Sequence, residues 1–183
     1  HEYNNISNPD SVEKIHKAYI EAGADIIQTN TYAAKKCQLK AYGYEDKFEE
    51  INIRAAEIAR KAAGENTIVF GTVGAIRGLR ECELSLETIV NETLDQVKVL
   101  LSTNKIDALL FETYYDQEEI RAVLTEVRKL TELPIITNIS LLEAGITQNG
   151  EKVTNALSTL VNLGADVVGL NCHLGPYHMI KSL

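Results

Sequence analysis

The sequence predicts an α/β protein with a parallel sheet, organised as part of a (β/α)8 barrel. Five short apolar segments alternate with amphipathic helical segments, and this order requires crossover connections between parallel strands. Polar side chains follow several of these segments, as at the active rim of such barrels. The chain has neither a G-x-G-x-x-G motif after a strand nor a P-loop, which disfavours doubly wound nucleotide-binding folds. Its 183 residues are fewer than the about 250 of a complete barrel, so we expect an incomplete one with about five strands.

The first predicted helix begins at Pro9 and ends at Gly23. Asn8 precedes the proline and is expected to be the N-cap, because proline is favoured at the first helical position. The expected buried face of this helix consists of Val12, Ile15, Tyr19 and Ala22. Residues 24–32 then predict the first visible strand. Residues 33–44, with three lysines, are expected to form a solvated loop with a short helix, and an anion site is the alternative for the lysines.

The middle of the chain predicts two further strand and helix pairs. Residues 45–63 form an amphipathic helix that ends at Gly64, and residues 67–74 form a strand. Ser85 is the expected N-cap of a long helix, and the next strand ends at Glu112. Asp116 and Glu119 have the spacing of a capping box at the start of another helix.

The last third repeats the pattern. A strand begins after Pro134, a turn-rich loop covers residues 145–150, and residues 153–163 form a helix that ends at Gly164. The following strand leads to Cys172, and a helical fragment begins at the Gly175-Pro176 pair.

Three of the predicted strands share one pattern at their ends. Each has an aspartate at its start and a polar residue five positions later, which is Asn30, Glu112 or Asn171, followed by Thr31, Thr113 or Cys172. Because the carboxyl ends of parallel strands meet at one edge, we expect these six side chains around one rim. Polar residues where strands meet loops are also common without any function, so the pattern alone leaves both readings open.

The composition limits the classes of function. A formal charge of −8 argues against nucleic acid as a partner, since that would need clustered Lys and Arg. No apolar run reaches the roughly 18 residues of a membrane span, and the amino end shows no signal-peptide pattern. Cys37, Cys82 and Cys172 form no C-x-x-C pair and predict no disulfide framework. A cytoplasmic protein is therefore expected.

Several motifs together resemble the homocysteine S-methyltransferase family. They are GADIIQTNTY, FGTVGAIRG, LLFETYYDQEE, the ISL segment with a downstream T-x-N-G, and GLNCHLGP, in that order over nearly all 183 residues. The nearest likeness is to bacterial two-part proteins that join this barrel to a methylenetetrahydrofolate reductase domain. The resemblance implies an enzyme of methionine biosynthesis that transfers a methyl group to the thiol of homocysteine, and it implies such a fused domain as a candidate partner.

The resemblance also implies a zinc ion. In this family one cysteine at the end of the sixth strand and a vicinal cysteine pair near the carboxyl end hold the metal, and Cys172 matches the first of these. Residues 1–183 contain no vicinal pair and no first strand with an Asp-Gly motif. We therefore expect a fragment of the methyltransferase domain, with the remaining zinc ligands outside it and no activity of its own, because one thiolate cannot make a zinc site.

By the same match, Glu112 is expected to accept hydrogen bonds from the homocysteine ammonium. Asn30, Thr31, Gly71, Asn138 and Asn171 are expected to support the substrate or the metal. At Gly71, a bare backbone would allow a ligand to approach the main chain, although glycines more often simply turn a chain. His173 is not expected to be a ligand, since adjacent residues of a strand point to opposite faces.

Two other functions remain open from the sequence. One is a pterin-binding type of barrel enzyme, without zinc and without a role for Cys172. The other is a non-catalytic remnant that keeps the fold and lacks the metal. The methyl donor is open as well, because relatives use methyltetrahydrofolate through cobalamin, S-methylmethionine, betaine or S-adenosylmethionine.

Overall fold

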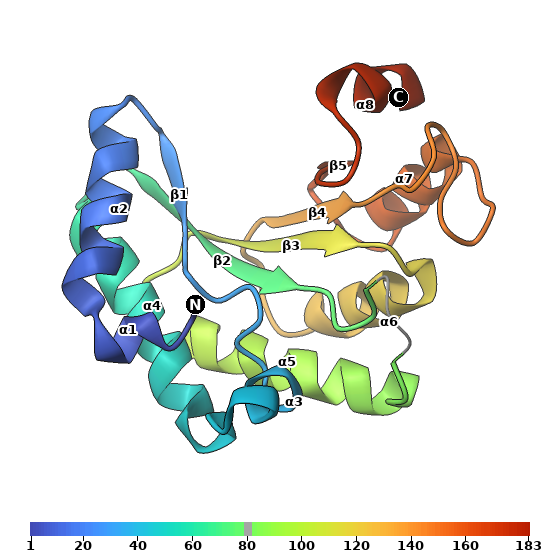
Figure 1. Cartoon of the computed structure of the whole chain (residues 1–183). Helices are drawn as coiled ribbons and strands as arrows, with labels where there is room; N and C mark the ends of the chain where they lie inside the picture. The colour runs from blue at the N-terminus through green and yellow to red at the C-terminus, as the bar shows by residue number, and fades with distance from the viewer. Residues whose placement is uncertain (79–81) are drawn as a thin grey trace. The chain divides into compact units, whose positions relative to one another are not determined.

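The computed structural model describes residues 1–78 and 82–183, and Figure 1 shows its elements. The chain forms two compact units. Unit 1 comprises His1–Val73 and Asp95–Leu109, and unit 2 comprises Gly74–Leu94 and Leu110–Leu183. Each unit is described by itself below.

The described residues contain five strands in the sheet order β1-β2-β3-β4-β5. They are β1 Ile26–Gln28, β2 Ile68–Gly74, β3 Ala108–Tyr114, β4 Ile135–Ile139 and β5 Val167–Leu170. The pairs β1–β2 and β4–β5 run parallel, with Ile27 opposite Val69 and Asn138 opposite Gly169. This confirms the parallel α/β class and the five strands, and no closed barrel forms among residues 1–78 and 82–183. The first strand is only three residues long, so the expected span of 24–32 was too generous.

Unit 1 places its helices around one long helix. The elements are α1 Asn4–Ser7, α2 Pro9–Glu21, α3 Lys36–Leu39 and α4 Phe48–Ala63, with 3-10 turns at Lys40–Tyr42 and Glu45–Lys47. Helices α1 and α2 both pack against α4 (Figure 1). A hydrophobic cluster of Ala34, Leu39, Phe48 and Ile51 joins α3 to α4. Gly64 ends α4 with φ of +59°, as the sequence predicts.

Two expectations for this unit were wrong in detail, and a third holds by position only. Ile15 and Tyr19 of α2 are 55% and 65% exposed, whereas Val12 and His16 are buried. The face of α2 that is buried therefore differs from the face that the apolar pattern predicts. Asn8 is the N-cap of α2 and Pro9 its first residue, as predicted, although the Asn8 side chain makes no capping bond. Lys35, in the stretch that we expected to be solvated, is fully buried.

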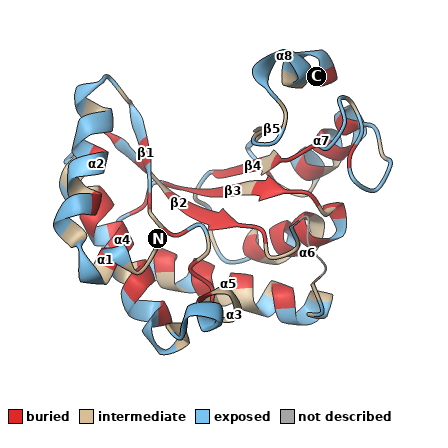
Figure 2. Cartoon of the chain, viewed as in Figure 1, coloured by how far each residue is buried: buried red, intermediate tan, exposed pale blue. Residues whose placement is uncertain are grey.

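Unit 2 contains α6 Gln117–Val127, α7 Val153–Asn162 and α8 Pro176–Ser182, and α5 Leu86–Ser102 begins in it. Ser85 Oγ accepts from the Thr88 backbone N–H at 3.2 Å, which confirms the predicted N-cap of α5. Helix α6 packs beside α7, and α7 packs beside β5. Figure 2 shows the buried positions along β4 and along one side of α6, where the apolar residues of the helical pattern lie.

The predicted capping box at α6 is only half present. Asp116 Oδ1 accepts from the N–H groups of Glu118 and Glu119 at 2.7 and 3.1 Å, as an N-cap should. Glu119 is fully buried and accepts instead from the backbone N–H groups of Ile76 and Arg77, at 2.8 Å each. Glu119 thus holds the loop after β2 against α6, a long-range contact that the local spacing does not reveal.

The aspartates of the repeated strand pattern have a structural role. Asp107 Oδ2 accepts from the Val69 N–H at 2.7 Å and pairs with Arg60 at 2.5 Å in unit 1. In unit 2, Asp166 Oδ2 accepts from the Ile135 N–H at 2.8 Å and pairs with Arg128 at 3.1 Å. Each aspartate therefore ties the start of its own strand to the preceding strand and to an arginine near the end of the helix before that preceding strand. This arrangement explains the aspartates in the pattern without a ligand.

Candidate functional site

Four polar side chains of unit 2 meet beyond the sheet, two from the end of β3 and two just after β5. Asn171 Nδ2 donates to Glu112 Oε2 at 3.2 Å and to Thr113 Oγ1 at 3.0 Å. The Thr113 hydroxyl in turn donates to Cys172 Sγ at 3.5 Å. We call Glu112, Thr113, Asn171 and Cys172 the strand-end cluster.

The backbone at this cluster is unusual. Thr113, Cys172 and His173 have φ values of 64°, 59° and 54°, in the left-handed region. That region is rarely adopted by β-branched residues, and such a conformation costs on the order of 1–3 kcal/mol. The Thr113 N–H donates to Asn171 Oδ1 at 3.0 Å, so a side chain binds this backbone group. The surrounding hydrogen bonds thus hold Thr113 in a backbone conformation that is unfavourable for an isolated threonine.

Glu112 is a half-buried carboxyl group. Burial raises its pKa above the ordinary value of 4.5, because desolvation disfavours the charged form. Asn171 donates to it, and no Lys, Arg or His side chain among residues 1–78 and 82–183 forms an ion pair with it. A partly desolvated carboxyl without a cationic neighbour is suited to a cationic ligand group.

Cys172 presents an exposed thiol next to this carboxyl. The Thr113 hydroxyl donates to its sulfur at 3.5 Å, and Asn171 Nδ2 lies 3.8 Å from the sulfur. The thiolate is the form of cysteine that binds metals. The part of the chain that the structure describes contains no group of three His, Cys, Asp or Glu side chains able to hold a metal ion. Cys172 therefore fits a metal as one ligand and does not complete a site.

His173 lies next to Cys172, and its ring packs edge-on to Tyr115 at 6.3 Å between centroids. The argument from strand alternation does not apply to it, because β5 ends at Leu170 and both residues lie in the left-handed region. Its ring is engaged with Tyr115, so the geometry gives no support for a ligand role.

Asn138 lies on β4 opposite Gly169. A Cβ added at Gly169 would lie 2.7 Å from Asn138 Oδ1, so the asparagine side chain occupies the space above this glycine. Asn138 is half-buried and lies on the strand next to the one that leads to Asn171. It remains a candidate for substrate support.

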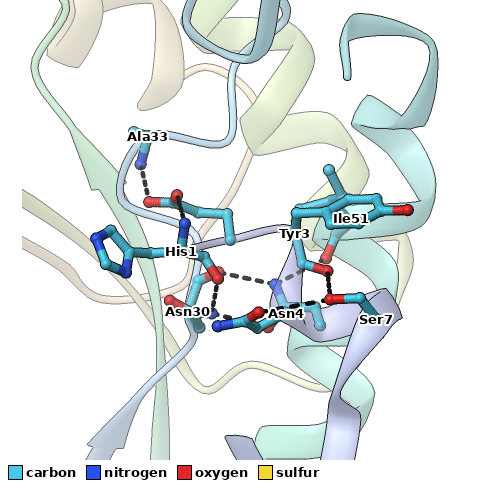
Figure 3. Close-up of polar contacts among 9 residues, drawn as sticks. His1, Tyr3, Asn4, Ser7, Asn30, Ala33 and Ile51 are labelled. Carbon is cyan, nitrogen blue, oxygen red and sulfur yellow. Dashed lines mark hydrogen bonds and ion pairs between the residues drawn. The ribbon is translucent and has the colours of Figure 1, made fainter. Parts of the chain in front are cut away.

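The three candidates in unit 1 already have intramolecular roles. Asn30 Nδ2 donates to the His1 carbonyl at 3.2 Å and to Asn5 Oδ1 at 3.0 Å, which attaches the amino-terminal segment (Figure 3). Thr31 is fully buried, and its hydroxyl donates to the Thr72 carbonyl at 2.7 Å. A Cβ at Gly71 would lie 2.8 Å from the Ile106 side chain, so packing explains this glycine. These contacts account for Asn30, Thr31 and Gly71 without a ligand.

Thr113 is the residue whose contribution the sequence did not reveal. Its place after Glu112 in the repeated pattern pointed to the strand end. No sequence signal indicates a left-handed threonine, because this conformation depends on a side chain 58 residues away. The hydroxyl contact with Cys172 depends on the same conformation.

Comparison with known proteins decides the family. The family model described as homocysteine S-methyltransferase matches residues 1–183. The chain belongs to the homocysteine S-methyltransferase family. It is 30% identical over 190 residues to a methionine synthase of Mycobacterium leprae and 28% identical to that of Mycobacterium tuberculosis. Each alignment covers 98% of this chain and 16% of the relative, so the chain spans about a sixth of the length of these proteins.

Solved structures show the fold of this homocysteine S-methyltransferase family member. The metallated form of the homocysteine methyltransferase MmuM from Escherichia coli superposes with a TM-score of 0.86 at 22% identity, covering 98% of this chain and 68% of that one. The N-acetylneuraminate lyase of Mycoplasma synoviae superposes with a TM-score of 0.59 at 15% identity, covering 96% of this chain and 52% of that one. At these identities the likeness concerns the fold, and it agrees with the barrel class that the sequence predicts.

Proposed function

We propose that this chain is the homocysteine-binding part of a zinc-dependent enzyme that methylates homocysteine to methionine. The observation that carries the proposal is the strand-end cluster, in which hydrogen bonds link a half-buried carboxyl to an exposed cysteine, and this carboxyl has no ion-pair partner among the described residues. The family assignment favours this function over a pterin-binding enzyme.

Glu112 binds the ammonium group of homocysteine in this proposal. The ammonium charge would favour the ionised carboxylate and offset the desolvation that raises its pKa. Asn171 orients the carboxylate through its 3.2 Å hydrogen bond, and Asn138 on the neighbouring strand is a further candidate contact. Asn30, Thr31 and Gly71, proposed from the sequence, have other contacts and gain no support here.

Cys172 is one zinc ligand in the proposal, and the other ligands lie outside residues 1–183. Its exposure and the hydrogen bond that it accepts from the Thr113 hydroxyl suit a metal ligand. Zinc would lower the pKa of the homocysteine thiol and hold it as a thiolate. The thiolate electron pair forms the new bond between sulfur and carbon. The bond between the methyl group and its donor breaks, and the donor keeps that electron pair.

The reaction is assigned to a larger protein. The chain spans only 16% of the methionine synthases that it matches, so the methyl donor and its binding region are left open. A fused methylenetetrahydrofolate reductase domain is one candidate for the rest. Within the described residues, no helix has the length and hydropathy of a membrane span. The described cysteines, Cys37, Cys82 and Cys172, are not in disulfide bonds, which suits the reducing cytoplasm, where we place the protein.

Metal analysis of the complete protein tests this function. We expect about one zinc per chain in the wild type and in Cys82→Ser, which removes a free thiol elsewhere in unit 2. Cys172→Ser should lose the metal while keeping the thermal unfolding midpoint of the metal-free wild type. Full zinc content in Cys172→Ser, or no zinc in the wild type, would contradict the proposal.

A further inference from the structure

We infer that Thr113 is a positioning residue that fixes the Cys172 sulfur through its side-chain hydroxyl. The inference rests on the proposed function for the use of that sulfur. The inference goes beyond the proposed function because it assigns a role to a residue that contacts neither substrate nor metal in that proposal.

The contacts of the Thr113 hydroxyl determine which bond it accepts and which it donates. Asn171 Nδ2 can only donate, and it lies 3.0 Å from Thr113 Oγ1, so the oxygen accepts there. The hydroxyl hydrogen is then free to point at Cys172 Sγ, 3.5 Å away. A chain of donors therefore runs from the Asn171 amide through Thr113 to the sulfur.

The backbone of Thr113 brings the hydroxyl to this place. Its φ of 64° departs from the extended conformation of β3, and its N–H binds Asn171 Oδ1 at 3.0 Å. Asn171 thus holds Thr113 by both the backbone and the hydroxyl. Because Cys172 directly follows Asn171, the two strand ends fix each other's side chains.

Such a contact should matter for a metal ligand. Hydrogen bonds to the ligand groups of a metal orient them, and losing one typically lowers metal affinity by about tenfold to a hundredfold. Thr113 occupies that position relative to Cys172, and serine is the one substitution that retains the hydroxyl on a side chain of similar size.

The test compares Thr113→Val, which keeps the branched shape without the hydroxyl, with Thr113→Ser in the complete protein. Thr159→Val is the matched control, because its hydroxyl donates to the Asn155 carbonyl at 2.9 Å in an exposed hydrogen bond within α7. Thermal unfolding identifies any variant that fails to fold. Zinc affinity is measured by competition with a chromophoric chelator, and we expect a loss of about tenfold or more in Thr113→Val, with serine and the control close to the wild type.

A second readout needs no metal. In metal-free protein, the alkylation rate of Cys172 by iodoacetamide is followed by mass spectrometry at increasing pH, and the variants are compared on the plateau where the rate no longer depends on pH. Cys82 in the same molecule is the reference. A hydrogen bond stabilises the thiolate, so Thr113→Val should react several-fold faster and Thr113→Ser should not. Equal rates in Thr113→Val and the wild type would overturn the inference. A wild type without zinc would overturn the proposed function, and the alkylation rate would still decide the role of Thr113.

Discussion

Asn171 Nδ2 donates to Glu112 Oε2 across 3.2 Å, although β4 lies between their two strands in the sheet order. The oxygen of the same side-chain amide, Asn171 Oδ1, accepts from the Thr113 N–H at 3.0 Å. One side chain therefore orients the carboxyl of Glu112 and the backbone that follows it. The substrate ammonium proposed for Glu112 would join a site that is already oriented.

The raised pKa of Glu112 predicts how stability depends on pH. In the folded state this carboxyl binds its proton up to a higher pH than the ordinary value of 4.5, so the folded state holds more protons in that window. Stability therefore falls as the pH rises from about 4.5 through the raised pKa. The variant Glu112→Gln lacks this loss, so its unfolding free energy relative to the wild type should rise between about pH 4 and pH 7.

Urea unfolding of the complete protein without substrate, at both pH values, measures this difference. Glu132→Gln, at an exposed position of the same unit, is the control. If the difference between Glu112→Gln and the wild type stays constant or shrinks as the pH rises, the carboxyl is not desolvated as described.

A second prediction concerns Gly164, at the turn between α7 and β5. Its φ is +105°, and an added Cβ would lie 2.7 Å from Arg128 Cδ. Arg128 cannot move freely, since it binds Asp166 at 3.1 Å and the Leu133 carbonyl at 2.8 Å. Gly164→Ala should therefore cost on the order of 2 kcal/mol of unfolding free energy, from backbone strain and crowding together.

Gly145→Ala is the matched variant for that measurement. Its φ is +82°, but no atom lies within 4 Å of the added Cβ, so only backbone strain applies. We expect a loss of about 1 kcal/mol, measured by urea denaturation. Equal losses in the two variants would show that Arg128 moves aside without cost.

The repeated pattern of strands and helices was enough to predict the fold. The three aspartates marked strand starts correctly, and for Asp107 and Asp166 the reason is now clear, because each binds the preceding strand and an arginine. Apolar spacing alone did not give the buried face of α2. The spacing defines a stripe, whereas burial depends on what the helix packs against, and α2 packs with His16 inward.

The grouping of the candidate residues was predicted in part. Glu112, Asn171 and Cys172 were expected at strand ends, and the structure brings them together in unit 2. Asn30 and Thr31 fitted the same pattern but bind the amino-terminal segment and the Thr72 carbonyl. Sequence position alone cannot distinguish a polar group that is free for a ligand from one that is satisfied within the fold, since the partners lie far away in the chain.

Calorimetric titration of the complete protein with homocysteine tests the central claim most directly. The comparison ligand is the analogue in which hydrogen replaces the amino group. The wild type should bind this analogue about tenfold to a hundredfold more weakly, because it lacks the charge-assisted bond to Glu112. Glu112→Gln should bind homocysteine more weakly by a similar factor and discriminate little between the two ligands. The account would be contradicted if Glu112→Gln discriminated between homocysteine and the analogue as strongly as the wild type does. It would also be contradicted if the wild type did not bind homocysteine.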